Sequence, residues 1–236
     1  RVFEKDIRRF LKPGMTLWFL HGLSVHFGLV KPPAEVDVIL LAPHAPGEAV
    51  REKYLADRSV SAFYAVYRNK SKKAAATVFK LAKGLGFRKK RLVKTTFEQE
   101  AVGDIFGEQA VLCGGLALLI KYGFETLVEN GLKPEDAYLE VAYQLDLIVG
   151  LIKKYGISGM FERISVTAQY GALNAGPVII DRGVKKRMKA VFGEIKSGKF
   201  TSKLDRLGQN ELKKLKTALK ALSHPELEKA AKKFSR

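Results

Sequence analysis

Asp104-Ile-Phe-Gly-Glu-Gln-Ala-Val-Leu-Cys-Gly-Gly115 places two acidic residues at the start of an apolar run. Asp104 and Glu108 are four residues apart, so on a helix their side chains lie on the same face. Asp104 also stands where the apolar periodicity begins, which is a favourable N-cap position. A buried helix carries such a pair only if the carboxylates are paired or bind a metal ion. The stretch therefore predicts either a solvated acidic face, which is the commoner arrangement, or an inward-facing cation site.

The sequence downstream of this stretch has a helical pattern throughout. We expect a long buried helix over 104–122 that ends at Gly123, and a central helix from Pro134 to about Lys154 with Gly156 behind it. The single cysteine, Cys113, lies in the apolar run, and we interpret it as a small core residue. Further helices are expected at 124–129, 165–170 and 185–195, and from Asn210 and Pro225 onward.

The sequence upstream alternates short apolar runs with helical segments. Strands are predicted at 15–20, 35–41 and 61–67, and helices at 48–55 and 72–84. This alternation predicts a parallel α/β sheet. Such sheets bind ligands at the carboxyl ends of their strands, so we expect His21 and the loop from His44 to Gly47 at the edge of a site. The change of pattern near Thr96 predicts an α/β domain over 1–96 and an all-helical domain over 97–236.

The chain is strongly basic, with a formal net charge of +18. Residues 185–236 hold 16 Lys and Arg but only 5 Asp and Glu. A basic excess can attract nucleic acid, but these lysines are spaced along amphipathic patterns without interleaved aromatic residues. We therefore interpret them as solvated helix faces and expect no specific nucleic-acid partner. No apolar run reaches about 18 residues without a charge, which predicts no transmembrane helix. A single cysteine fits the reducing cytoplasm.

A second polar pair lies on the central helix. Glu140 and Gln144 are again four residues apart and are flanked by apolar residues. Together with Asp104 and Glu108 they would offer three carboxylates and one amide, an oxygen ligand set that suits Mg²⁺.

Several motifs in this sequence resemble those of ketol-acid reductoisomerase, an enzyme of branched-chain amino-acid biosynthesis. The resemblance covers the whole chain and is carried by five stretches in order: Leu20-His-Gly-x-x-x-His-Phe-Gly28, the stretch 104–115, Gly123-Phe-Glu-Thr-Leu-Val-Glu129, Thr167-Ala-x-Tyr-Gly171 and Gly176-Pro177. It implies a Rossmann-like NADPH-binding domain, here partial, followed by an all-α knotted domain that binds two Mg²⁺ ions and forms a homodimer or a higher homo-oligomer.

The resemblance also implies roles for individual residues. Asp104 would bridge the two metals and Glu108 would bind one of them, while Glu140, from the partner subunit in the short form of the family, would contribute to the other. Ser165 matches a substrate-binding serine, His21 an active-site histidine, and Gly47 a glycine of the cofactor loop. The small-molecule substrate would be an acetohydroxy acid, 2-acetolactate or 2-aceto-2-hydroxybutyrate, whose alkyl group migrates before NADPH reduces the new ketone to give the 2,3-dihydroxy acid.

The sequence departs from the family in three places. Gln144 stands where the family has a glutamate, so we expect the second Mg²⁺ site to be weak. His44 stands where the family has a lysine; it is a candidate catalytic residue, although a neutral imidazole does not reproduce a constant charge. No strand followed by Gly-x-Gly-x-x-Gly occurs, and the chain does not begin with Met. We therefore expect a piece of a longer chain that binds NADPH weakly by itself.

Two functional hypotheses follow from the sequence. The first is an NADPH- and Mg²⁺-dependent reductoisomerase. The second is a catalytically degenerate relative that keeps the fold and acts as a dimeric binding or assembly module.

Overall fold

The computed structural model describes residues 2–234 and divides the chain into two compact units, Arg1–Ile105 and Phe106–Arg236. The first unit begins with two short irregular helices, Phe3–Ile7 and Arg8–Phe10. Strands and helices then alternate: β1 (Thr16–Phe19), α1 (Leu23–His26), β2 (Asp37–Pro43), α2 (Gly47–Leu55), β3 (Ala62–Arg68), α3 (Ala74–Gly84), a short 3₁₀ turn at Lys89–Arg91, β4 (Leu92–Lys94) and α4 (Phe97–Gly107). The predicted order of a sheet region followed by a helical region is confirmed.

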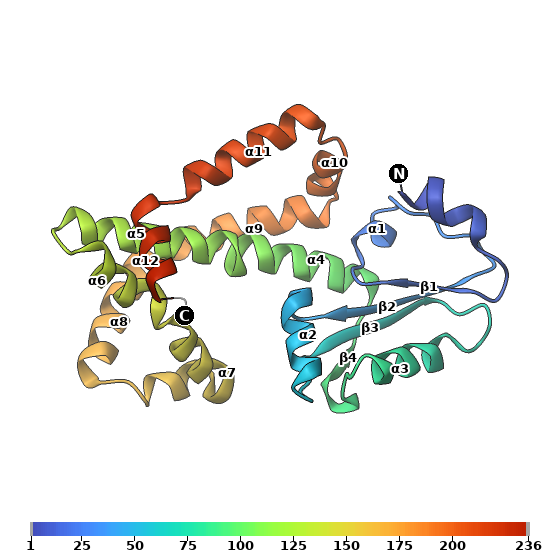
Figure 1. Ribbon diagram of the computed structural model, residues 1–236, viewed down its shortest axis with the longest axis horizontal. Helices are drawn as coiled ribbons and strands as arrows, with labels where there is room; N and C mark the ends of the chain where they lie inside the picture. Colours follow the sequence, from blue (N-terminus) through green and yellow to red (C-terminus); the bar gives the residue numbers. More distant parts are fainter. Residues whose placement is uncertain (1, 235–236) are drawn as a thin grey trace. The chain divides into compact units, whose positions relative to one another are not determined.

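The four strands form one mixed sheet in the order β1-β2-β3-β4 (Figure 1). β1 is parallel to β2 and β3 is parallel to β4, but β3 is antiparallel to β2. The prediction of an all-parallel sheet was therefore wrong. The physical reason is that the segment containing α2 does not cross to the other end of the sheet, although Val50 of α2 packs on the cluster of Leu41 and Ala62. Instead Pro43 pairs with Ala62, and the His44 N–H extends this ladder by donating to the Ser61 carbonyl at 2.9 Å.

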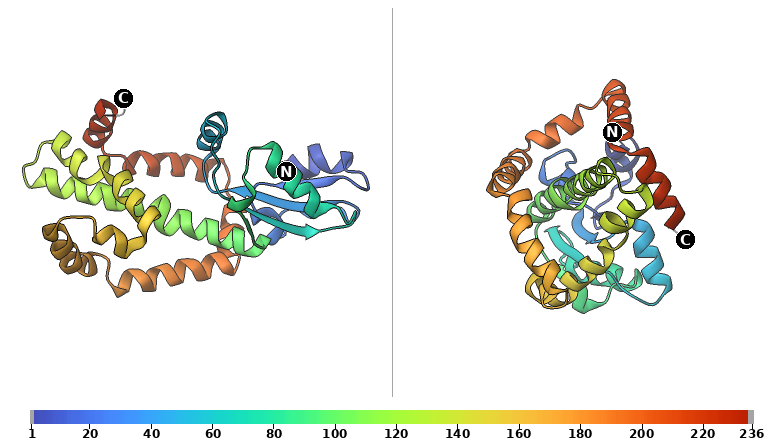
Figure 2. Two further views of the ribbon diagram at one scale, coloured as in Figure 1. Left: turned by 90° about the horizontal axis from the view of Figure 1, so that it is seen from below. Right: turned by 90° about the vertical axis from the view of Figure 1, so that its left-hand side faces the viewer.

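β2 forms the centre of the core because both of its faces are covered. Val38 and Leu40 point to one face, where they pack with Phe97 from the start of α4. Ile39 points to the other face and packs with Val78 of α3; α3 lies along this face of the sheet (Figures 1 and 2). The core thus fixes the first turn of α4 against the sheet, close to the ends of β1 and β2.

The second unit is helical throughout the part that the structure describes. Its elements are η4 (Glu108–Leu112), α5 (Gly114–Glu129), α6 (Pro134–Tyr138), η5 (Leu139–Tyr143), α7 (Leu145–Phe161), α8 (Val166–Ile179), α9 (Arg182–Lys196), α10 (Lys199–Asp205), α11 (Gln209–Leu222) and α12 (Pro225–Phe234). η4 and η5 are π-helical turns that interrupt two of the predicted helices. In a π turn the N–H groups bond five residues back instead of four, which adds one residue to the turn.

Several helix boundaries differ from the prediction. The helical segment containing Asp104 starts at Phe97 and helix α5 passes Gly123 and ends at Glu129, so Asp104 is not an N-cap and Gly123 is not a stop. The predicted stop at Gly156 is confirmed: this residue has the non-helical angles φ 75° and ψ 178°, so α7 consists of two helices that meet at a break there. A positive φ is a conformation that glycine adopts readily because it has no Cβ, and this is the reason a glycine marks the end of the regular helix here.

α12 packs on α6 and η5 through aromatic side chains, and Figure 1 shows α12 beside α6. Tyr138 stacks on Phe234 with a ring-centre distance of 5.9 Å, and Lys233 lies 3.4 Å from Glu135. Phe124 of α5 is fully buried and contacts the ring of His224. These contacts hold the carboxyl-terminal helix of the described chain on the centre of the helical unit.

Many apolar side chains of the helical unit are nevertheless exposed. Leu112, Leu147 and Leu173 are each more than 60% exposed. Cys113 is also exposed, so its interpretation as a core residue was wrong, as was the expectation that helix 104–122 is buried within the chain. An apolar pattern predicts burial only where a second layer of structure covers the helix.

The helical run Phe97–Glu129 is long and apolar enough to cross a membrane by length and composition. Only 6% of its most apolar window is buried within the described chain. One such helix is weak evidence for a membrane span, because core helices of soluble proteins have the same composition. The run also carries Asp104 and Glu108, and carboxylates are costly inside a bilayer.

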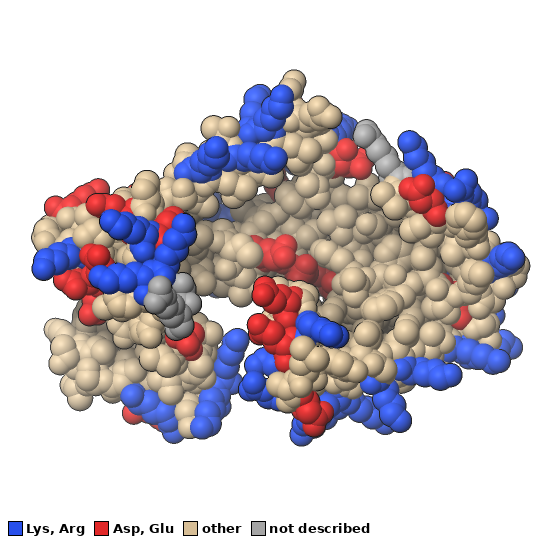
Figure 3. All heavy atoms as spheres, viewed as in Figure 1, with Lys and Arg blue, Asp and Glu red and all other residues tan. Residues whose placement is uncertain are grey.

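Lys and Arg are spread over the visible face rather than gathered in one patch (Figure 3). Some of the lysines of the basic carboxyl-terminal region form intrachain ion pairs, since Lys199 and Lys203 both contact Glu194. This arrangement agrees with the interpretation of these lysines as solvated helix faces.

Candidate active site

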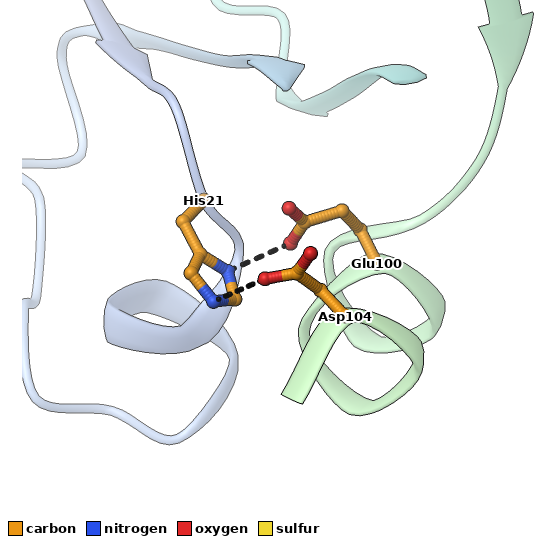
Figure 4. Close-up of side chains that lie close together, drawn as sticks. All are labelled: His21, Glu100 and Asp104. Carbon is orange, nitrogen blue, oxygen red and sulfur yellow. Dashed lines mark hydrogen bonds and ion pairs between the residues drawn. The ribbon is translucent and has the colours of Figure 1, made fainter. Parts of the chain in front are cut away.

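His21 lies between two carboxylates of α4 (Figure 4). It follows β1 by two residues, in the loop that leads into α1. Its Nδ1 is 3.0 Å from Glu100 Oε2 and its Nε2 is 3.1 Å from Asp104 Oδ2. Both ring nitrogens are therefore engaged, one by each carboxylate. Since Glu100 and Asp104 are four residues apart on α4, one face of this helix supplies both partners.

Glu100 is the buried member of this cluster. Its side chain is 4% exposed, whereas that of Asp104 is 43% exposed. Glu100 Oε2 also accepts a hydrogen bond from the Gly22 N–H at 2.5 Å. Glycine is required at position 22 because a Cβ there would collide with the Phe97 carbonyl and with the Glu100 carboxylate. Glu100 thus fixes the His21 loop on α4, and Asp104 remains open to a ligand.

The two carboxylates make His21 a much stronger base than a free histidine. Hydrogen bonds to Asp104 and then to Glu100 raise the pKa of His21 to about 10, and burial opposes them with a smaller lowering effect. The imidazole is therefore protonated at neutral pH, with both N–H groups donating to carboxylate oxygens.

We expect His21 to stay protonated far above its ordinary range when no divalent metal is present. Its C–H resonances, followed by NMR from pH 5 to 11, should titrate near pH 10, and Asp104→Asn should lower that midpoint. Folding raises the pKa of His21 above the value of about 6.5 in an unfolded chain. The resulting stability is fully present below about pH 6.5 and is lost as the pH rises through about 10. The side chain is 38% exposed, so this contribution is about 1 kcal/mol. A midpoint near pH 6.5 would contradict the geometry.

The other acidic residues of the predicted site lie in the helical unit, in or beside the π turns. Glu108 is the first residue of η4 and is exposed. Glu140 lies in η5 and Gln144 directly follows it. The Gln144 amide donates to Glu140 Oε2 at 3.3 Å and to the carbonyls of Leu139 and Glu140 at 3.4 Å. The structure therefore brings Glu140 and Gln144 together, and it uses the amide protons of Gln144 to satisfy carbonyls of the π turn.

The remaining predicted residues lie on other elements. His44 follows β2 directly, and its ring packs edge-on against Phe63 at 4.3 Å. β1 and β2 are parallel, so the ends that lead to His21 and His44 face the same edge of the sheet, as predicted. Gly47 is the first residue of α2, and a Cβ there would meet open space. Ser165 is exposed and caps α8 by accepting a hydrogen bond from the Ala168 N–H.

Sequence reasoning missed Glu100, which is the residue that holds His21 in place. The signal for it was present, since Glu100, Asp104 and Glu108 follow one another at intervals of four residues. A carboxylate repeated at this spacing stays on one helix face over two turns.

The carboxylates of this cluster suit a hard divalent cation, whereas His21 is protonated on both ring nitrogens and is not a ligand. One ligand atom each from His21, Glu100 and Asp104 lies within 4.8 Å of the others. Mg²⁺ prefers carboxylate oxygens and retains several waters. Because Glu100 is already bonded to Gly22 and His21, Asp104 is the member of this group that is best placed to bind such an ion.

Comparisons with known proteins identify two matching family models. Residues 97–236 match the model described as "Ketol-acid reductoisomerase, C-terminal domain". Residues 1–90 match that described as "Acetohydroxy acid isomeroreductase, NADPH-binding domain".

Curated relatives and a solved structure give the same result. A ketol-acid reductoisomerase (NADP(+)) of Pyrobaculum arsenaticum is 50% identical over 200 residues, 85% of this chain and 61% of that protein. That of Pyrobaculum islandicum is 45% identical over 226 residues, 95% of this chain and 68% of that protein. The structure of an NADH-preferring ketol-acid reductoisomerase from an uncultured archean superposes with a TM-score of 0.93 at 37% identity, covering 99% of this chain and 71% of that chain. The chain thus spans about three fifths of the length of the first of these relatives.

Proposed function

The chain belongs to the ketol-acid reductoisomerase family, and from this premise we propose that it forms part of an NADPH- and Mg²⁺-dependent ketol-acid reductoisomerase. The proposed substrate is an acetohydroxy acid such as 2-acetolactate, which is converted into a 2,3-dihydroxy acid in branched-chain amino-acid biosynthesis. The observation that carries this proposal is the cluster of His21, Glu100 and Asp104 beside the carboxyl end of β1, within motifs of the family. No observation favours the alternative of a catalytically degenerate module.

Asp104 and Glu108 would hold the first Mg²⁺, and Glu140 of a second copy would contribute to the other. When bound, Mg²⁺ supplies Lewis-acid polarisation of the substrate oxygens, and NADPH supplies the hydride. In this chain Glu100 orients His21, and protonated His21 in turn holds Asp104 through Oδ2. His21 therefore positions the metal-binding carboxylate and keeps a proton beside it. Ser165, at the exposed start of α8, and His44, after β2, are proposed to face the substrate, and Gly47 the cofactor.

Gln144 is the residue that limits the second metal site in this proposal. Its amide offers a neutral oxygen where a carboxylate would offer a charge, and its N–H groups are already engaged by η5. We therefore expect this second site to fill only at high Mg²⁺ concentration or together with substrate.

The test of the proposed function is a product analysis with the full-length protein. NMR spectra of 2-acetolactate incubated with NADPH and Mg²⁺ should show the dihydroxy acid, and omitting either Mg²⁺ or NADPH should abolish it. Unchanged 2-acetolactate after prolonged incubation with a folded protein would contradict the proposal and favour the degenerate module instead.

A dimer is part of the proposal because the exposed apolar side chains of the helical unit need a second layer. Leu112, Leu147 and Leu173, each more than 60% exposed, would be covered by a second copy in a knotted domain of the family type. Light scattering of the full-length protein at low micromolar concentration should give at least twice the mass of one chain. A stable folded monomer at that concentration would contradict this prediction.

We place the enzyme in the cytoplasm, with neither membrane nor nucleic acid as a partner.

A further inference from the structure

The helix that carries Glu108 changes its hydrogen-bonding pattern at this residue. α4 ends at Gly107 and η4 runs from Glu108 to Leu112. The Cys113 N–H donates to the Glu108 carbonyl, five residues back, at 3.0 Å. The Ala117 N–H then donates to the Cys113 carbonyl, four residues back, so the regular α-helix resumes. One extra residue is therefore inserted directly after Glu108, and such π turns are frequent at functional sites.

Two glycines directly after the π turn are required by its geometry. A Cβ on Gly114 would collide with the Gln109 carbonyl oxygen, and a Cβ on Gly115 with that of Ala110. Both clashes are with backbone atoms, which cannot rotate away as a side chain would. At Gly150, in α7, a Cβ would meet open space. The π turn thus depends on the absence of side chains at positions 114 and 115.

The extra residue sets the direction in which Glu108 points relative to α5. Successive residues of an α-helix are about 100° apart around its axis. If the turn reverted to a regular α-helix with the extra residue still in the chain, Glu108 would rotate by about that angle around the helix axis relative to α5. α5 itself is anchored in the helical unit, where Gly123 lies against Val141 of η5. Glu108 would then face a different side of the unit.

We propose that Gly114 and Gly115 are positioning residues for Glu108, because they keep the π turn that aims its carboxylate. The inference rests on the proposed function, in which Glu108 is a metal ligand. A related feature favours it: Glu140, the other carboxylate assigned to a metal in this unit, also lies in a π turn.

The experiment measures Mn²⁺ binding to the full-length protein by electron paramagnetic resonance, with Mn²⁺ in place of Mg²⁺. Gly114→Ala should bind Mn²⁺ at least about 10-fold more weakly than the wild type, as is typical when the support of a metal ligand is lost. Gly150→Ala is the matched control, since it places the same methyl group on a helix of the same unit without a clash, and it should bind as the wild type does.

A second variant keeps the test decisive if Gly114→Ala fails to fold. Deletion of Ala110 in the Gly114→Ala background removes the extra residue, so a regular α-helix without the clash keeps Glu108 in its direction relative to α5, and this double variant should regain both helical circular dichroism and Mn²⁺ affinity. Wild-type affinity in folded Gly114→Ala, or weak Mn²⁺ binding by the folded double variant, would overturn the inference alone. Absence of Mn²⁺ binding in the wild type would overturn the proposed metal site, and the inference would fall with it.

Discussion

Asp104→Asn should lower the turnover of 2-acetolactate by the full-length protein at least about 1,000-fold. The substitution keeps the size of the side chain and removes the charge that would hold the metal. Polarisation of a substrate oxygen by a metal ion contributes several kcal/mol to the transition state, and about 1.4 kcal/mol corresponds to a factor of ten in rate. The exposed position of Asp104, with only Oδ2 engaged by His21, makes its carboxylate the most accessible one of the cluster.

The measurement is steady-state NADPH oxidation over a range of Mg²⁺ concentrations. Asp205→Asn, on the exposed face of α10, is the matched control and should leave the rate unchanged. If Asp104→Asn kept a rate within tenfold of the wild type at saturating Mg²⁺, Asp104 would not be a principal metal ligand.

Glu100→Ala should strongly destabilise the sheet-containing unit. Glu100 is 3% exposed, and its Oε2 accepts from the Gly22 N–H while pairing with His21. Removing the carboxylate leaves the buried Gly22 N–H without its acceptor and His21 Nδ1 without its partner. Breaking a buried pair in this way costs about 3 kcal/mol.

Urea denaturation, followed by the fluorescence of Trp18 in β1, measures this loss. Glu98→Ala is the matched control, because Glu98 lies in the same first turn of α4 but is exposed; it should change the free energy of unfolding by less than about 0.5 kcal/mol. Glu100→Gln retains an acceptor for the Gly22 N–H, so its free energy of unfolding should fall less than that of Glu100→Ala. Equal stabilities of Glu100→Ala and Glu98→Ala would show that Glu100 does not hold the loop.

Three of the four strands were predictable from the sequence, but β4 and the direction of β3 relative to β2 were not. A short apolar run bounded by turn residues indicates an extended segment, as it does for β1, β2 and β3. It does not report the pairing partner. The connection between β2 and β3 was long enough for a crossover, but the chain re-enters the sheet beside Pro43, which pairs with Ala62, so β3 runs back along β2.

The candidate site was predictable only in part, for two physical reasons. The motif led to His21 and Asp104, whose contact depends on the folding of α4 against the loop after β1, but the buried Glu100 resembled an ordinary acidic residue of a first helical turn. The π turns left no periodic signal, because a single inserted residue changes the hydrogen bonding and hardly alters the apolar pattern. The adjacent glycines Gly114 and Gly115 were the available trace.

Burial in the helical unit was overestimated from composition for a related reason. The run from Ala110 to Ile120 is strongly apolar, yet Val111 and Leu112 are at least half exposed in the structure. An apolar composition shows that a helix face is suited to packing against other apolar residues. Such a face is buried only where another helix or another chain covers it.

Anomalous diffraction from crystals of the full-length protein soaked in Mn²⁺ tests the proposed metal site most directly. We expect an anomalous peak at about 2.0–2.3 Å from carboxylate oxygens of Asp104 and Glu108, distances typical of a small hard cation bound by oxygen. His21 should remain bonded to Glu100 beside it. A peak elsewhere, or no peak beside an intact pair of His21 and Asp104, would contradict the account.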